Sequence, residues 1–286
     1  MKYIKYFFEF LFSIVFFIIF KILGPSTSSE ISGKIFEFIG PFFRSKKLIY
    51  SNITKAYPNI DEEELKRLTK LMWNNYGRIF SEYIFIKDFR FGKLVDKIDI
   101  EGQEYLNEIK NFNKQVVFIS GHFSNFELMA MCIEKSGVQL SALYRPLNNI
   151  FLNMIMEKIR VKYICKNQIK KGLGGLKKLI SFKNKNYSTA LMIDQRVSEG
   201  ILSKFFNSEA LTTTIPAQLV KKYNIPIVPV YIERVKGINF KLVIKKPITF
   251  SREETIKSIT DKLNQTLETM ILKKPEQWIW SHNRWK

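Results

Sequence analysis

"QVVFISGHFSNFELM", residues 115–129, joins an apolar, β-branched run directly to a helix-favouring stretch, and this junction indicates the fold class. The run at 115–120 has the length and composition of a buried strand, and a helix is expected near 125–135. Further strands are predicted at 138–144, 188–194, 225–233 and 240–246, and further helices near 149–160, 173–182, 214–223 and 252–273. This alternation predicts an α/β domain with a mixed, mostly parallel central sheet flanked by helices.

The amino-terminal segment is apolar around its whole circumference. Between Lys5 and Lys21 only Glu9 and Ser13 interrupt the apolar run, which predicts a helix in lipid, either a short span or a re-entrant arm. A cleaved signal peptide is the alternative, but the segment that follows has no A-x-A cleavage site. We therefore expect two parts, a membrane anchor helix at 1–24 and one globular domain at 25–286.

The chain is strongly basic, and the excess is concentrated. Lys and Arg number 46 against 26 Asp and Glu, a formal charge of +20, and residues 141–190 hold 11 basic residues but one acid, Glu157. Such a band suits an anionic partner, which could be a phospholipid surface, a phosphorylated substrate or nucleic acid, although part of the excess can be solvated surface. The positive-inside rule favours a cytoplasmic body at an inner membrane.

Two cysteines, Cys132 and Cys165, lie in apolar surroundings and are predicted to be reduced core residues. No cysteine pair or histidine stands at metal-ligand spacing, so neither a metal nor a cofactor is expected.

His122 lies where the first predicted strand meets its helix, the end of an α/β sheet at which active sites collect. Glu127 could orient the imidazole, provided that His122 precedes the helix in a turn, because on one continuous helix the two side chains would diverge. Alternatively, Ser124 and Glu127 form a capping box, in which the carboxylate binds the capping residue's amide. Between these partners we expect the imidazole.

Two more predicted strands are followed by polar residues at the same edge of the sheet. Arg145 follows the strand at 138–144, and Asp194, Gln195 and Arg196 end the strand at 188–194. Because parallel strands present their carboxyl ends together, these residues should converge with His122 on one site. Arg145 is suited to clamp a phosphate or carboxylate.

Several other residues could bind an anionic substrate. Lys170 and Lys171 precede a glycine-bearing turn, although the glycine spacing fits neither a Rossmann motif nor a P-loop. Thr213 lies in a threonine run before a helix, where capping is the alternative role. Arg284 and His282 belong to the Trp-rich segment "PEQWIWSHNRWK", which suits either a lipid headgroup region or packing against the core.

In this order the motifs resemble the lipid A biosynthesis acyltransferases, the lauroyl and myristoyl transferases that form a branch of the glycerolipid acyltransferase superfamily. The likeness runs through the anchor, "GPFFRSKKLIYSNITKAYPN", "GHFSNFE", "LYRP", "DQ", "TTTIPAQLVKKYNIPIVPVYIER" and "PEQWIWSHNRWK". One position departs from it, because many members have a second aspartate where this chain has Arg196.

The resemblance implies an O-acyltransferase in which His122 removes a proton from a sugar-linked hydroxyl and Glu127 orients the base. Arg145 and the Asp194 loop would line the site. The implied donor is an acyl group on acyl carrier protein, and the implied acceptor is an anionic glycolipid, the lipid A precursor. An acidic carrier protein and a phosphorylated membrane lipid would both suit the basic surface.

Two alternatives remain open at this point. The same chemistry could act on another membrane acceptor, such as a phosphatidylinositol mannoside or a lysophospholipid. A non-enzymatic, basic membrane-associated binding protein is the second alternative, but the sequence has no helix-turn-helix or aromatic RNA-binding signature, so nucleic acid is not expected as a partner.

Overall fold

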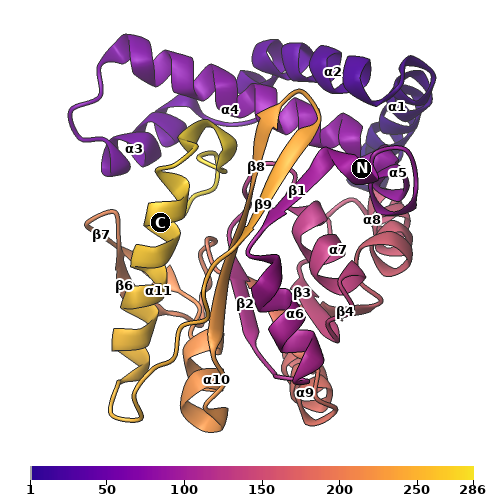
Figure 1. The fold of residues 1–286 in the computed structure, drawn as a ribbon. Helices are drawn as coiled ribbons and strands as arrows, with labels where there is room; N and C mark the ends of the chain where they lie inside the picture. Colours follow the sequence, from indigo (N-terminus) through magenta and orange to yellow (C-terminus); the bar gives the residue numbers. More distant parts are fainter. Residues whose placement is uncertain (1) are drawn as a thin grey trace.

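The computed structural model describes residues 2–286, with the backbone alone for Leu173. Its central sheet has seven strands in the order β1-β9-β8-β2-β5-β3-β4, and all neighbouring pairs are parallel except β8 with β9. These strands are β1 (Ile98–Glu101), β2 (Val117–Ser120), β3 (Leu140–Tyr144), β4 (Asn167–Lys170), β5 (Ser188–Met192), β8 (Ile227–Lys236) and β9 (Asn239–Ile244). The predicted fold class, a mixed and mostly parallel sheet flanked by helices, is confirmed (Figure 1).

Helices cover both faces of the sheet and one end of it. Figure 1 shows α2 and α4 across one end of the sheet, with α1 and α8 at one flank and α10 and α11 at the other. The helices are α1 (Lys2–Leu23), α2 (Pro25–Ile39), α3 (Lys46–Ala56), α4 (Glu62–Glu82), α5 (Ile86–Phe91), α6 (Gln103–Asn111), α7 (Glu127–Lys135), α8 (Ile150–Ile159), α9 (Leu173–Asn184), α10 (Ile215–Tyr223) and α11 (Ile256–Ile271). A π-helical turn, Arg160–Ile164, extends α8.

Local sequence explains where some of these elements begin. Asp61 caps α4, since its carboxylate accepts a hydrogen bond from the Glu64 amide at 2.7 Å, and three glutamates occupy the first turn, as the helix dipole favours. The central strand β2 is buried at all four positions, which is why it reads as a continuous apolar run. Cys132 and Cys165 are buried and free, as predicted.

The predictions missed four short strands. β1 and β4 are the two edges of the sheet, where one side of each strand has no partner, and their sequences "IDIE" and "NQIK" are too short and polar to read as buried runs. β6 (Ile201–Phe205) and β7 (Ser208–Thr212) form a separate antiparallel hairpin. Its turn residues, Phe206 and Asn207, both have positive φ, yet the sequence carries no Asn-Gly or Asp-Gly signal.

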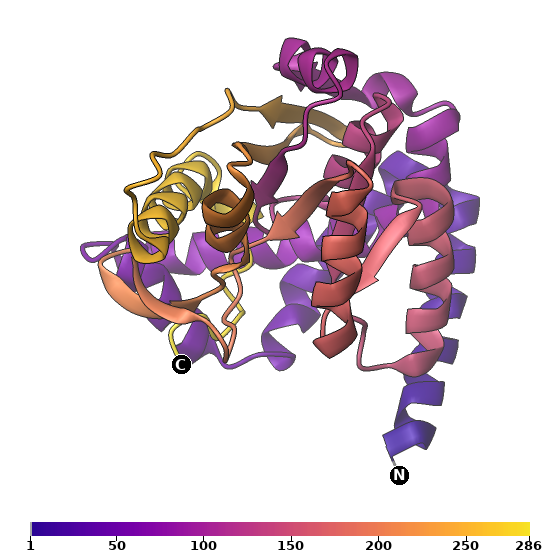
Figure 2. The same ribbon diagram turned by 90° about the horizontal axis from the view of Figure 1, so that it is seen from below.

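α1 is the one helix among the described residues that is long and apolar enough to cross a membrane, with a mean hydropathy of 2.2. It does not stand apart from the domain. Figure 2 shows it alongside α8, with its amino-terminal end projecting past the body.

Candidate active site

The site lies at the carboxyl ends of three adjacent strands, β2, β5 and β3, in that order across the sheet. Each strand is followed by a polar residue of the site: His122 after β2, Asp194 after β5 and Arg145 after β3. The sequence predicted that these three loops converge, and the structure places them together because the strands are parallel and in register. His122 precedes α7 in a turn, as the catalytic interpretation required.

The imidazole of His122 is held by a buried carboxylate. Its Nδ1 lies 2.8 Å from Oδ1 of Asp194, and its backbone amide donates to Oδ2 of the same carboxylate at 2.7 Å. Because a carboxylate only accepts, Nδ1 carries the ring proton and Nε2 keeps its lone pair. Asp194 is fully buried, whereas 20% of the His122 side chain is exposed.

The two groups shift each other's acidity. Burial tends to lower the pKa of His122, but the charge and the hydrogen bond of Asp194 outweigh it, so the pKa of the imidazole is raised. Burial tends to raise the pKa of Asp194, but interaction with His122 and a hydrogen bond from the indole of Trp278, 2.9 Å from Oδ2, bring that pKa below its usual range. The carboxylate therefore stays charged and stabilises the imidazolium.

The structure corrects the partner expected for Glu127. Its carboxylate binds neither the imidazole nor a capping amide; Oε1 accepts a hydrogen bond from Nε of Arg160 at 2.9 Å and another from Nη2 of that residue. α7 begins only at Glu127, and Ser124 has a positive φ and a buried hydroxyl without a partner in the described part of the chain, so no capping box forms. Asp194 instead takes the position next to the imidazole.

Arg160 is a site residue that the sequence analysis missed. Its guanidinium is buried between Glu127 and the ring of Tyr144, whose centroid lies 5.2 Å from Cζ. Within the described residues, Nη1 of this guanidinium is buried without a hydrogen-bond partner. The charge of Glu127 more than offsets burial, so the pKa of Arg160 is raised and the group stays cationic beside the pocket.

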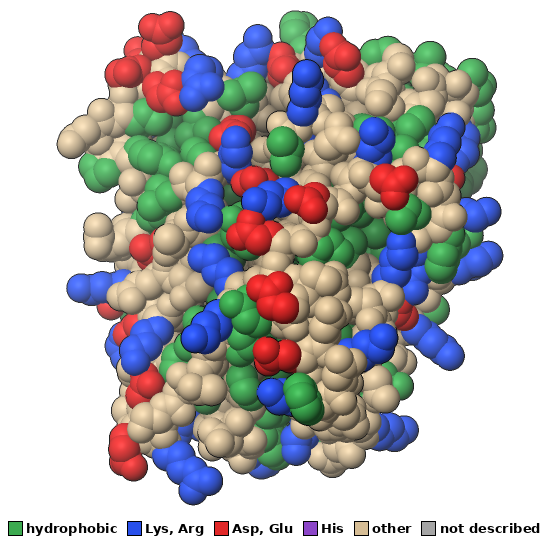
Figure 3. All heavy atoms as spheres, viewed as in Figure 1, with side chains coloured by type: hydrophobic (Ala, Val, Ile, Leu, Met, Phe, Trp, Pro, Cys, Tyr) green, Lys and Arg blue, Asp and Glu red, His purple; other side chains and the backbone are tan. Residues whose placement is uncertain are grey.

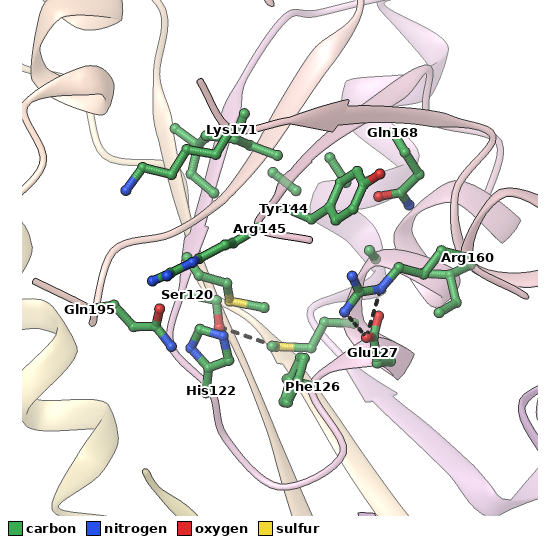
Figure 4. Close-up of a pocket in the computed structure, with 18 of the residues that line it drawn as sticks. Ser120, His122, Phe126, Glu127, Tyr144, Arg145, Arg160, Gln168, Lys171 and Gln195 are labelled. Carbon is green, nitrogen blue, oxygen red and sulfur yellow. Dashed lines mark hydrogen bonds and ion pairs between the residues drawn. The ribbon is translucent and has the colours of Figure 1, made fainter. Parts of the chain in front are cut away.

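His122 opens onto a pocket of about 470 Å³, within the size range of small-molecule sites. Its inner part is apolar, and its lining includes Phe118, Met129, Ala130, Ile133, Ala142 and Ile164. Its mouth is polar and basic; Figure 4 shows Arg145 and Lys171 above His122, with Gln195 beside the imidazole. The pocket therefore has an apolar interior, a base and a cationic entrance.

Some of the predicted substrate-binding residues line the pocket and others do not. Arg145, Lys171, Gln195 and Thr213 line the pocket, and Arg196 does too. Partial burial and the nearby Arg145 cation lower the pKa of Lys171, although the charge of Glu199 acts in the opposite direction.

Lys170 and Arg284 lie elsewhere. Lys170 pairs with Glu157 at 3.0 Å and faces a neighbouring hollow rather than this pocket. Arg284 is fully buried and outside the pocket lining; it donates to the carbonyl of Leu211 and the hydroxyl of Thr212, each at 2.6 Å. The geometry gives Arg284 a structural role rather than the expected contact with substrate.

The Trp-rich segment packs against the core, the second of the two readings that the sequence allowed. Trp278 and Trp280 are buried, and the carbonyl of Gln277 accepts a hydrogen bond from the amide of Ser124, in the His122 turn, at 2.8 Å. His282 lines the pocket and accepts from the Arg196 amide at 3.1 Å; burial lowers its pKa to about 4, so it is neutral at neutral pH. The three tryptophans of the segment were the only signal in the sequence for this packing.

Comparison with known proteins identifies the family. A model of the bacterial lipid A biosynthesis acyltransferases matches residues 1–286. Lipid A biosynthesis acyltransferase 2 of Shigella flexneri is 21% identical over 90% of this chain and 82% of its own length. The lipid A biosynthesis myristoyltransferase of Escherichia coli is 20% identical over 90% and 80%, and a lipid A biosynthesis acyltransferase of Haemophilus influenzae is 22% identical over 89% and 81%. The chain belongs to the bacterial lipid A biosynthesis acyltransferase family.

Proposed function

We propose that the chain transfers a fatty acyl group from acyl carrier protein to a hydroxyl of a lipid A precursor, with His122 as the general base. The observation that carries this proposal is the position of His122. Its imidazole, held by Asp194, stands where a polar, cationic mouth meets an apolar interior. An acyl thioester fits the interior with its carbonyl near the base, and an anionic glycolipid fits the mouth.

The reaction follows from this arrangement. Nε2 of His122 takes the proton of the acceptor hydroxyl while the oxygen attacks the thioester carbonyl carbon. Collapse of the tetrahedral intermediate breaks the carbon–sulfur bond, and the imidazolium returns its proton to the departing sulfur, which leaves as the carrier's free thiol. Asp194 fixes the tautomer that can accept the proton and stabilises the imidazolium. No metal or cofactor takes part.

Glu127 enters this proposal through Arg160. The carboxylate holds a guanidinium that keeps one buried nitrogen, Nη1, without a partner among the described residues. A fixed cation beside the pocket can stabilise the negative charge that develops on the carbonyl oxygen, which is where acyl transfer gains most from electrostatics. Glu127 is thus proposed as a positioning residue, and Arg160 as the group that contacts the reacting atoms.

The mouth supplies the acceptor's anionic contacts. Arg145 and Lys171 are proposed to bind a phosphate of the lipid A precursor, with Gln195 and Thr213 as neutral hydrogen-bonding neighbours. The body is proposed to lie on the cytoplasmic face of the inner membrane, where both the carrier protein and the precursor are available.

The test uses purified protein, acyl carrier proteins with acyl chains of several lengths, and separate acceptors: a lipid A precursor, a lysophospholipid and a phosphatidylinositol mannoside. We expect the mass of one acyl group to be added to the lipid A precursor, with release of carrier thiol, and loss of transfer in His122→Gln. Transfer only to another acceptor would replace the proposed substrate; full activity of His122→Gln would refute the base.

A further inference from the structure

α1 contacts the body from Tyr6 to Lys21. Its buried and half-buried residues are Tyr6, Phe10, Ser13, Ile14, Phe16, Phe17 and Phe20. Five of them, Tyr6, Phe10, Ser13, Phe17 and Phe20, form a stripe spaced alternately by four and three residues. That spacing keeps them on one side of the helix. The segment therefore packs sideways against the domain instead of leaving it end-on.

The amino-terminal part of this contact is formed by α8. Asn149, the buried cap of α8, donates to the carbonyl of Tyr6 at 2.9 Å and to Oε2 of Glu9 at 3.1 Å. The rings of Phe7 and Phe151 meet edge-on at 5.7 Å. α1 is thus fixed to the body within its first three turns.

The carboxyl-terminal part is fixed as well. Nζ of Lys21 lies 3.2 Å from Oδ2 of Asp88, and Phe17 packs on Phe80 of α4 with ring centroids 5.0 Å apart. Phe20 is buried. Both ends of α1 are therefore attached to the body.

These two attachments conflict with an upright span. Phe7 and Lys21 are 14 residues apart, about 21 Å along a helix. With Lys21 at one membrane surface, the start of α8 would lie about two thirds of the way through a hydrocarbon core of about 30 Å. Asn149 and the neighbouring polar residue Asn148 would go with it, and buried polar groups in hydrocarbon are costly. The opposite orientation would bury the Lys21–Asp88 pair equally deeply.

The outward side of α1 is apolar and continues onto α8. Phe8, Leu11, Val15 and Ile22 lie on the side of α1 opposite the packed stripe, and Ile150 and Met154 are exposed on α8. We call these six residues the apolar flank. Hydrophobic side chains also reach the surface at the upper right edge of Figure 3, where Figure 1 places α1. Exposed lysines adjoin the flank: Lys2, Lys5 and Lys21 on α1, and Lys158 one turn beyond Met154.

We propose that α1 lies in the plane of one leaflet of an anionic bilayer, side by side with α8, and that the apolar flank is the surface that enters the lipid. An amphipathic helix at a membrane surface ordinarily turns a polar face toward water. In α1 that side packs against the body instead, so α1 needs no polar face of its own. The adjoining lysines match anionic headgroups at the depth of the flank. The occupant is the bilayer, because the helix has both the length and the hydropathy of a lipid-embedded segment.

This arrangement places the pocket entrance at the membrane surface. Arg145, Pro146 and Leu147 line the pocket and lead directly into α8, and Leu147 is itself exposed. A membrane lipid can then enter the pocket sideways without leaving the leaflet. The placement of α1 depends on no step of the proposed reaction, so either proposal can fail alone.

Cysteine labelling tests the orientation. The natural cysteines, Cys132 and Cys165, are 5% and 1% exposed, so they give a low background. Lys2→Cys reports the amino-terminal end of α1, and Phe112→Cys, 70% exposed on the body, is the matched control. In sealed phosphatidylethanolamine–phosphatidylglycerol vesicles with the body facing outward, a membrane-impermeant maleimide added outside should label both positions equally. Labelling of Lys2→Cys only after detergent would show a span and overturn the proposal.

A depth measurement covers the remaining outcome. Fluorophores on Val15→Cys and Met154→Cys should both be quenched by lipids that carry a shallow spin label, and less by lipids that carry a deep one. Stronger quenching by the deep label at Val15→Cys would contradict the in-plane helix. Absence of lipid quenching, with cross-linking between Val15→Cys copies, would assign the flank to a second copy of the chain.

Discussion

Asparagine in place of Asp194 should inactivate the enzyme while leaving its shape intact. In the native site Oδ2 accepts from the His122 amide at 2.7 Å and from the Trp278 indole at 2.9 Å, and Oδ1 faces Nδ1 of His122 at 2.8 Å. The single oxygen of asparagine is best placed at the Oδ2 position, where it satisfies two donors. Its amide NH₂ then faces Nδ1, and the imidazole must move its proton to Nε2.

That tautomer cannot act as a base toward the pocket. The loss combines a charge-assisted hydrogen bond, worth about 1.5–3 kcal/mol, with the cost of the wrong tautomer or an unsatisfied buried N–H, about 1–3 kcal/mol. We therefore expect kcat/KM to fall by about 10²- to 10⁴-fold, and the upper end is the scale seen when a triad aspartate is replaced in the same way.

The assay is acyl transfer from acyl carrier protein to the lipid A precursor, with circular dichroism to verify folding. Asp261→Asn is the matched control, because that carboxylate of α11 binds Ser203 of β6 and Lys257 and does not line the pocket. The control should keep nearly full activity. A decrease of less than tenfold in a folded Asp194→Asn variant would refute the tautomer argument.

Three further predictions concern the pKa, the ion pair and the pocket. Because the pKa of His122 is raised, kcat/KM should decline as pH falls through a midpoint above the ordinary value of 6.5; a midpoint below 6.5 would contradict the Asp194 interaction. Arg160→Met, which leaves Glu127 charged and buried, should lower the free energy of unfolding in urea by about 3–5 kcal/mol, and adding Glu127→Gln should restore much of it; additive losses would contradict direct pairing. Ala130→Leu narrows the apolar interior and should shift the product toward shorter acyl chains in mass spectrometry; an unchanged distribution would place the chain elsewhere.

The sheet and the convergence of its loops could be predicted because they depend on local signals. Buried strands such as β2 show as continuous apolar runs, and parallel strands necessarily bring residues such as His122 and Arg145 to one edge. The edge strands β1 and β4 gave no such signal, because short half-paired strands need little apolar sequence.

The pairing of charges within the site could not be predicted in the same way. Glu127 is five residues from His122 and was the expected partner, whereas Asp194 is 72 residues away. Separation along the chain cannot show which of these carboxylates lies next to the imidazole. That depends on where α7 begins and on the register between β2 and β5. The partner of Glu127, Arg160, comes from the end of α8, a contact that only the packed structure defines.

The dependence of Asp194 on Trp278 has a consequence for biosynthesis. The indole that completes the carboxylate's hydrogen bonds lies 84 residues beyond it in sequence, and the segment around it also binds the His122 turn. A nascent chain therefore exposes α1 long before residue 278 leaves the ribosome, and until then the carboxylate of Asp194 lacks its indole donor. In the proposed reaction, His122 would therefore acquire its fully held carboxylate only late in synthesis, after α1 has had time to reach the bilayer proposed for it.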